Sequence, residues 1–289
     1  MISIVISSGD PELLKDVSEN ISQTIGVPHE VLGINNTNAQ MGICEAYNEG
    51  IRTAKYDLIC FMHEDLIIKT NDWGKLIHGY FDADPKLGLI GIAGSTYKAL
   101  CPSSWFTWVD KGNMRQLIQR FKYHSEEPRL IYDNPENSKL SEVVAVDGVW
   151  FCTRRDIARK IGFDNQMLIG FHGYDVDFSL AVAQDWKVAV SFEVLIEHFS
   201  EGGYDSNWLK STILLHKKWR HVLPRRAGAG LDKADAFLCE KNAFLFLLEI
   251  MSECGYTKRE MYRVLWGSRL YKAVGIKQFF RFYKYIRRR

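Results

Sequence analysis

The sequence lacks an apolar run that approaches the roughly 18 residues needed to cross a bilayer. Its longest comparable stretch, residues 243–248, is only six residues long. The first residues form a strand-like apolar run with no basic segment and no cleavage site, so we expect no secretory signal. Six cysteines are scattered without a CxxC pair or a regular spacing. We therefore expect reduced thiols and a cytoplasmic protein.

Several motifs that define common enzyme classes are also missing. No GxGxxG follows the first predicted strand and no Walker A motif occurs, which argues against a dinucleotide or P-loop site. No GxSxG elbow is present, and no cysteine stands beside an obvious base. A hydrolase with a serine or cysteine nucleophile is therefore not expected.

The charge is almost balanced but unevenly distributed. The 289 residues include 37 Lys and Arg against 35 Asp and Glu, a net charge of +2. Residues 258–289 hold 11 of the basic residues and one acid, Glu260, so the rest of the chain carries −8. This segment predicts either a solvated helix or a helix that rests on an anionic membrane surface. Nucleic-acid binding is the weakest alternative, because no recognition module accompanies the charge.

Strand-like and helix-like segments alternate through the first third of the chain. Apolar strands at 2–7, 30–34, 58–62 and 87–93 are separated by helical patterns that begin at Asp10, at Gly42 and at Trp73. This order predicts an α/β fold with a mainly parallel sheet flanked by helices, resembling a Rossmann-like nucleotide-binding half. In such sheets the functional polar groups gather at the carboxyl ends of the strands.

The rhythm is lost over residues 95–142, which are rich in aromatic residues and turn formers. We expect an irregular insertion that forms a lid or an acceptor wall. A strand-like run interrupted by Asp147-Gly148 is predicted at 143–153 and a strand at 187–196, with helices at 156–161 and 178–184. We expect one domain over 1–208 and a helical, basic C-terminal extension over 209–289.

Polar residues follow the predicted strands at the edge where a ligand would bind. His63 and Asp65 fall on one side of an extended backbone, with Glu64 turned away. His198 ends another predicted strand at the same edge, so the three residues could hold a divalent cation such as Mn²⁺ or Mg²⁺. A solvated acidic turn and a structural histidine are the simpler alternatives.

Neutral groups at the same edge suit a nucleoside. Ser7, Ser8, Asn35 and Asn36 end the first two strands and offer hydrogen bonds to a base and a ribose. Asp175 and Asp177 stand at a predicted helix start. There they either cap the helix or supply a general base that takes a proton from a bound hydroxyl.

Taken together, these residues resemble a family-2 glycosyltransferase with the GT-A fold, over residues 2–208. His63-Glu64-Asp65 stands where this family carries its DXD motif, and Tyr174-Asp175 where it carries an acidic pair. The other matching segments are the stretch around Asn48, the donor-sugar segment from Asp147 to Phe151, and His198 at a third metal-ligand position. The sequence is most similar to a bacterial glycosyltransferase-like subgroup with His-x-Asp in place of DXD and a GFHGYD base loop.

This resemblance implies a hexosyltransferase-type enzyme that moves a sugar from a nucleotide-diphosphate sugar to an acceptor hydroxyl with inversion. UDP is the favoured nucleotide, and Asp65, His63 and His198 would hold Mn²⁺ or Mg²⁺. Asp175 would be the base, or Asp177 if the alignment shifts by two residues. The implied donor-binding residues are Ser7, Ser8, Asn35, Asn36, Asn48, Glu64, Asp147 and Gly148. Trp105, Trp108, Trp150 and His172 are the candidates for acceptor contacts.

Two departures from the family pattern leave alternatives open. His63 replaces the first DXD acid, so a metal-independent site is one alternative, and Tyr174 replaces the usual glutamate beside Asp175. The expected acceptor is a glycan or a lipid-linked glycan at the inner membrane face, in bacterial surface-polysaccharide biosynthesis. The competing functions are a non-catalytic nucleotide-sugar or glycan-binding protein and a nucleotidyltransferase. The absence of a glycine-rich basic loop after the first strand argues against the nucleotidyltransferase.

Overall fold

The computed structural model describes residues 1–38, 40–122, 126–228 and 230–288. Within these residues, the larger sheet has seven strands in the order β10-β13-β5-β12-β3-β1-β2. Five strands run in one direction, whereas β12 and β10 run against them. The bounds are β1 Ile2–Ser8, β2 His29–Asn35, β3 Leu58–Met62, β5 Leu87–Gly91, β10 Leu140–Val143, β12 Trp150–Arg154 and β13 Lys187–Ser191.

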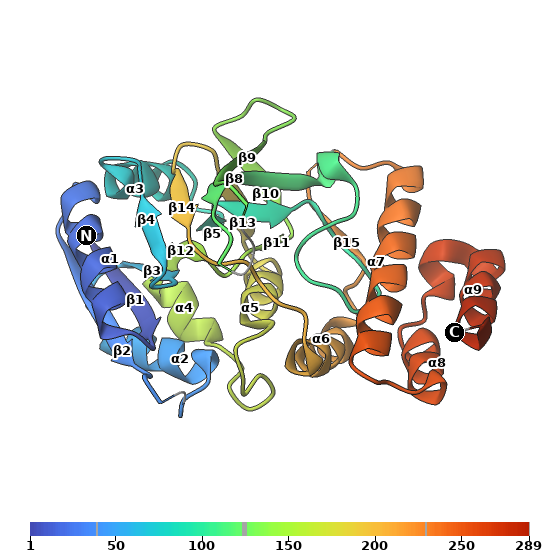
Figure 1. Cartoon of the computed structure of the whole chain (residues 1–289). Helices are drawn as coiled ribbons and strands as arrows, with labels where there is room; N and C mark the ends of the chain where they lie inside the picture. The colour runs from blue at the N-terminus through green and yellow to red at the C-terminus, as the bar shows by residue number, and fades with distance from the viewer. Residues whose placement is uncertain (39, 123–125, 229, 289) are drawn as a thin grey trace.

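Helices cover both faces of this sheet (Figure 1). On β1, Ile4 and Ile6 pack with α1 and α3, whereas Val5 packs with α2, α4 and α5, as expected from side chains that alternate along a strand. α1 begins where Asp10 caps the amides of Glu12 and Leu13. The bounds are α1 Pro11–Thr24, α2 Ile43–Thr53, α3 Trp73–Ala83, α4 Arg155–Ile161 and α5 Tyr174–Val182. The predicted α/β fold with a mainly parallel sheet flanked by helices is confirmed.

A second sheet was not expected from the sequence. It has the order β11-β6-β8-β14-β4, with β9 paired to β8. The segment 95–142, expected to be irregular, contains β7, β8, β9 and the start of β10. β8 escaped notice because polar and apolar residues do not alternate regularly along it. The bounds are β4 Leu66–Ile68, β6 Ala93–Ser95, β7 Tyr97–Lys98, β8 Asn113–Gln119, β9 Arg129–Asp133, β11 Ala145–Val146 and β14 Ile196–His198, with a short 3₁₀ helix at Asp110–Gly112.

Three segments with a strand-like pattern are each split between the two sheets. The segment 87–93 becomes β5 and the start of β6, 143–153 becomes β11 and β12, and 187–196 becomes β13 and the start of β14. Both halves of each segment are buried. In 87–93 the change of sheet falls inside an apolar run and leaves no mark in the hydrophobic pattern. In 143–153 it falls at Asp147-Gly148, the interruption that the sequence shows, and in 187–196 Glu193 lies at the break.

The remaining helices lie at the other end of the molecule from β1 and β2 (Figure 1). They are α6 Ser206–Trp219, α7 Lys233–Glu253, α8 Lys258–Gly267 and α9 Tyr271–Arg288, and β15 Arg225–Arg226 pairs with β7. α7, α8 and α9 share a separate hydrophobic cluster with Tyr97, Ala99 and Cys101. The predicted boundary at residue 208 falls inside α6. In the described chain, no helix combines the length and the apolar character that a membrane span requires.

Candidate active site

A cleft of about 670 Å³ opens at the carboxyl ends of the central strands and is bounded on one side by the second sheet. Its walls come from the ends of β3 and β14, the turn before β12, the start of α5 and the loop that follows β7. The predicted site residues that line it are Ser7, His63, Glu64, Asp65, Trp105, Asp147, Gly148, His172, Asp175 and His198. The topology therefore gathers residues that are up to about two hundred positions apart in the sequence.

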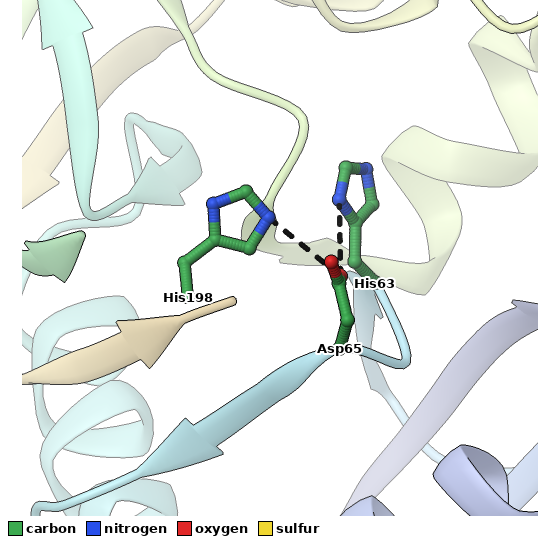
Figure 2. Close-up of side chains that lie close together, drawn as sticks. All are labelled: His63, Asp65 and His198. Carbon is green, nitrogen blue, oxygen red and sulfur yellow. Dashed lines mark ion pairs between the residues drawn. The ribbon is translucent and has the colours of Figure 1, made fainter. Parts of the chain in front are cut away.

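Three of these side chains converge on one point of the cleft (Figure 2). His63 follows β3, Asp65 precedes β4 and His198 ends β14, which pairs with β4. Asp65 Oδ1 lies 3.6 Å from His198 Nε2 and 3.9 Å from His63 Nδ1. All three potential ligand atoms lie within 4.8 Å of one another. As expected, Glu64 turns away, and its carboxylate accepts from the amides of Gly9 and Asp10.

The protonation states of this cluster suit a cation. Burial would raise the pKa of Asp65, but His198, Ser200 and His63 outweigh burial and lower it to about 2. Burial, together with the charge of His198, lowers the pKa of His63 to about 4. At neutral pH the cluster therefore offers an ionised carboxylate and a neutral His63 imidazole, the forms that bind metal. One carboxylate and two imidazoles match Mn²⁺ better than Mg²⁺, because Mg²⁺ prefers oxygen ligands.

Tyr174 fixes the orientation of His63. The Tyr174 hydroxyl donates to the carbonyl of Gly148 at 3.1 Å and lies 3.0 Å from His63 Nε2. Because a carbonyl can only accept, both contacts are hydrogen bonds when the Tyr174 proton goes to Gly148 and His63 Nε2 carries its own proton. This assignment leaves the lone pair of Nδ1 facing Asp65. A side chain at Gly148 would collide with Tyr174, because its Cβ would lie 2.1 Å from the hydroxyl oxygen.

The carboxylate of Asp175 lines the same cleft from the first turn of α5. Burial, followed by the negative charge of Asp147, raises the pKa of Asp175 to about 7. Asp147 is held in place, since it accepts from the amide of Val149 at 2.8 Å and from the indole of Trp105. A carboxylate with a pKa near neutrality can accept a proton and release it again at physiological pH.

Asp177 lies on a different face of α5 from Asp175 and does not line the cleft. Its Oδ2 lies 2.9 Å from Lys218 Nζ, and its Oδ1 accepts from the indole of Trp219 at 2.6 Å. Lys218 also bonds Asp164 at 2.8 Å. Asp177 is buried in this ion-pair network, which ties α5 to α6. Its geometry is that of a structural residue, whereas Asp175 is the acid that faces the cavity.

Two residues that we expected to contact a ligand lie away from the cleft. Trp150 is in the packed interior, and Asn48 contacts Phe163. Trp150 is fully buried against Trp73, with ring centroids 5.7 Å apart, and so cannot stack on a sugar. Asn48 bonds both the amide and the carbonyl of Phe163 at 2.8 Å. These two expectations were wrong in placement, because a strand residue and a helix residue each had two faces to choose from.

The remaining predicted residues lie at the rim or beside the cleft. Trp108 is partly exposed and packs against Phe246 of α7. Ser8 is buried and donates to the carbonyl of Asp10. Asn35 and Asn36 use their side chains within their own loop, on Thr37 and on Met41.

Sequence reasoning missed several residues that the fold brings to the cleft. Ser200 donates to Asp65 Oδ2 at 2.5 Å, and its place two residues after His198 was the available signal. Arg115 and Gln119 reach the cleft from β8, the strand that the hydrophobic pattern did not reveal. Phe171 and Tyr204 add exposed aromatic surface to the walls.

Comparison with known proteins identifies the family of this chain. The profile of the glycosyltransferase-like family matches residues 3–201. Among curated proteins, no sequence matches this chain significantly.

Solved structures with a similar fold include three glycosyltransferases. Residues 1–349 of Staphylococcus aureus TarS in complex with UDP-GlcNAc are 10% identical, with a TM-score of 0.54 over 94% of this chain and 83% of that chain. GalNAc-T7 with UDP, GalNAc and Mn²⁺ is 12% identical, with a TM-score of 0.51 over 89% of this chain and 54% of that chain. A mannosyltransferase from Pyrobaculum calidifontis with GDP-Man and Mn²⁺ is 12% identical, with a TM-score of 0.50 over 94% and 73% of the two chains. At these identities the likeness concerns the fold. The chain therefore belongs to the glycosyltransferase-like family and has a GT-A fold.

Proposed function

We propose that this protein transfers a sugar from a nucleotide-diphosphate sugar to an acceptor hydroxyl, with metal dependence and inversion at the anomeric carbon. One observation carries the proposal: the His63, Asp65 and His198 cluster and the Asp175 carboxylate open onto the same cleft. A charge-neutralising centre and a base of suitable pKa are the two groups that such a transfer requires.

Asp65, His63 and His198 are the residues that would hold Mn²⁺, with Mg²⁺ as the alternative. A bound cation would neutralise the charge that develops on the departing diphosphate. The chain's own contribution is orientation: Ser200 fixes the Asp65 carboxylate, and Tyr174 presents the unprotonated nitrogen of His63. Hydrogen-bonded partners of this kind commonly tune metal ligands.

Asp175 would act as the general base. It would take the proton from the acceptor hydroxyl while that oxygen forms a bond to C1 of the sugar. The bond from C1 to the diphosphate oxygen breaks in the same step, and the nucleoside diphosphate departs. Attack from the face opposite the leaving group inverts the anomeric centre. Asp147 supports this role, because its charge helps to raise the pKa of Asp175.

The donor would lie against Ser7, Glu64, Asp147 and Gly148, which line the cleft between β1 and the turn before β12. We favour UDP as the nucleotide. Two of the similar solved structures hold UDP or a UDP-sugar, and one holds GDP-mannose. The size of the cleft, about 670 Å³, is in the range of small-molecule sites.

The acceptor would occupy the aromatic side of the cleft. Trp105 is fixed there by its bond to Asp147, and His172 lies 3.6 Å from Asp205 at the start of α6. An indole face suits stacking on a sugar ring. We propose a glycan or a lipid-linked glycan as the acceptor, used in surface-polysaccharide biosynthesis at the inner membrane face.

A donor screen tests this function. UDP-, GDP- and dTDP-sugars would be incubated with the protein and Mn²⁺, Mg²⁺ or EDTA, and both nucleoside diphosphate release and thermal shifts would be recorded. We expect donors of one nucleotide to stabilise the fold in the presence of Mn²⁺. We also expect slow release of the nucleoside diphosphate from one of these donors. A stabilising nucleotide without turnover, unchanged in Asp175→Asn, would instead indicate a non-catalytic nucleotide-sugar-binding protein.

A further inference from the structure

The outer face of α9 carries an exposed apolar ridge. Phe279, Phe282 and Ile286 are buried and hold the helix to its neighbours, with the rings of Phe282 and Phe244 4.8 Å apart. About a quarter turn around the helix from them, Ile276 is 64% exposed, Phe280 48% and Tyr283 38%. Their spacing of four and three residues places them in one line along the helix. Moving such large apolar side chains out of water lowers the free energy.

A basic ridge runs directly beside the apolar one. Lys277, Arg281, Lys284 and Arg288 are exposed and repeat at the same helical spacing, one residue further along. We call these four residues, with Ile276, Phe280 and Tyr283, the docking face. In α8, the ring of Trp266 packs 4.7 Å from Phe279 and is 52% exposed, so it extends the apolar area.

No acidic residue of α9 neutralises the positive charge of the docking face. α9 contains no Asp or Glu. The single acid after residue 257 is Glu260, which accepts from the amide and the hydroxyl of Thr257 in the capping box of α8. The potential above the docking face is therefore positive and favours an anionic partner.

We propose that the docking face binds the surface of an anionic lipid bilayer. The apolar ridge would enter the headgroup region, and the basic ridge would contact lipid phosphates. Charge complementarity alone would also fit a nucleic acid, but exposed Ile276 offers neither stacking nor a hydrogen bond to a nucleotide. α9 lies at the outer edge of the molecule, where a flat surface can reach it (Figure 1).

Vesicle sedimentation tests the proposal with the whole chain and without any donor or metal. Vesicles would contain either phosphatidylcholine alone or equal parts of phosphatidylcholine and phosphatidylglycerol. We expect binding to the anionic vesicles that weakens as salt is added. Lys277→Gln combined with Lys284→Gln should lower the affinity about 30-fold, from the contribution of each basic residue near a bilayer. Ile276→Ser combined with Phe280→Ser should lower it about tenfold or more.

Substitutions are preferable to removal of residues 270–289, because that segment contains Phe279, Phe282 and Ile286 of the core. Lys75→Gln combined with Lys160→Gln is the matched control, since both side chains are more than half exposed far from α9. It should bind vesicles as the wild type does. Asp65→Ala should also bind normally, so vesicle binding is independent of sugar transfer.

Two results would overturn the proposal. One is equal binding to both kinds of vesicle, or none to either, by a protein that melts normally. The other is tight binding to single-stranded RNA that both α9 double variants abolish while vesicles are ignored, which would make the docking face a nucleic-acid surface.

Discussion

At the scale of single residues, Asp175 sets function against stability. Its pKa, raised to about 7 from an ordinary value of 3.8, means that the folded state holds this proton more strongly than the unfolded chain does. The stabilisation is complete below about pH 4 and is lost as the pH rises through about 7. Asp175→Asn should therefore raise the melting temperature at pH 8 relative to wild type, and this difference should shrink steadily as the pH is lowered to about 4.

The same substitution should lower sugar transfer about a thousandfold, because it removes the base. Transfer by the wild type should rise with pH through about 7. Asp177→Asn is the matched control: it weakens the ion pair with Lys218, so it should lower the melting temperature and leave the pH profile in place. If Asp177→Asn abolished transfer and Asp175→Asn did not, the assignment of the base would be reversed.

Tyr174 acts on the cation through His63. In Tyr174→Phe the ring packing is kept, but His63 Nε2 loses its partner and the imidazole can turn. The affinity for Mn²⁺, measured by electron paramagnetic resonance titration, should fall about tenfold. Tyr97→Phe removes a similarly buried hydroxyl, bonded to Glu240 at 2.8 Å, and should leave the affinity unchanged. Equal affinities in all three proteins would exclude a role for Tyr174 in orienting His63.

Single-residue geometry could be predicted only where local rules decide it. The sequence pattern placed His63 and Asp65 together with Glu64 turned away, and the structure has this arrangement although residues 63–65 form a bend between β3 and β4. Trp150 and Asn48 depend on which neighbouring element covers them, and the sequence alone does not contain that information. The residue type alone does not show whether a tryptophan is exposed or buried.

At the scale of elements, the C-terminal helices brace the cleft wall. Glu240 of α7 is fully buried and accepts from the amide of Leu100 at 2.7 Å and from the hydroxyl of Tyr97. Beside it, the buried ammonium of Lys98 donates to Ser103, which lines the cleft, and lies 2.7 Å from His216 Nε2 of α6. Hydrogen bonds to α6 and α7 thus hold the segment that leads to Trp105.

This bracing makes a prediction for stability. Glu240→Ala leaves three buried donors without an acceptor, the Tyr97 hydroxyl and the amides of Leu100 and Cys101, and should lower the free energy of unfolding by about 3 kcal/mol. Glu240→Gln keeps one acceptor oxygen and should cost about 1 kcal/mol. Urea unfolding followed by tryptophan fluorescence measures both. A loss in Glu240→Gln as large as that in Glu240→Ala would contradict this explanation, because glutamine keeps both the side-chain volume and one acceptor oxygen.

The elements themselves were predictable where helices alternate with short buried strands. β3 was located to the residue, and the starts of α1 and α2 were marked by Asp10 and by Gly42. The second sheet was not predictable, because its strands are either short or continue apolar runs that belong to the first sheet. It is this sheet that brings His198 beside Asp65 and Arg115 into the cleft.

At the scale of the whole molecule, the two halves depend on each other. A chain that ends at residue 208 would lose Lys218 and Trp219, the partners of Asp177, and would expose Tyr97 and its neighbours. We expect such a chain to be insoluble or to melt without cooperativity, as judged by circular dichroism. A soluble fragment with a cooperative transition would show that residues 1–208 fold by themselves.

The central claim is that the cluster and Asp175 together perform metal-dependent sugar transfer. The most direct measurement is the rate of nucleoside diphosphate release from the stabilising donor, with Mn²⁺ or EDTA, in the wild type, Asp65→Ala and the control Asp57→Asn. Asp57 lies just before β3, at the opposite end of that strand, and is largely exposed. We predict release by the wild type and Asp57→Asn that needs Mn²⁺, and a loss of at least about a hundredfold in Asp65→Ala. Release that is equally fast in EDTA, or in Asp65→Ala, would contradict the account.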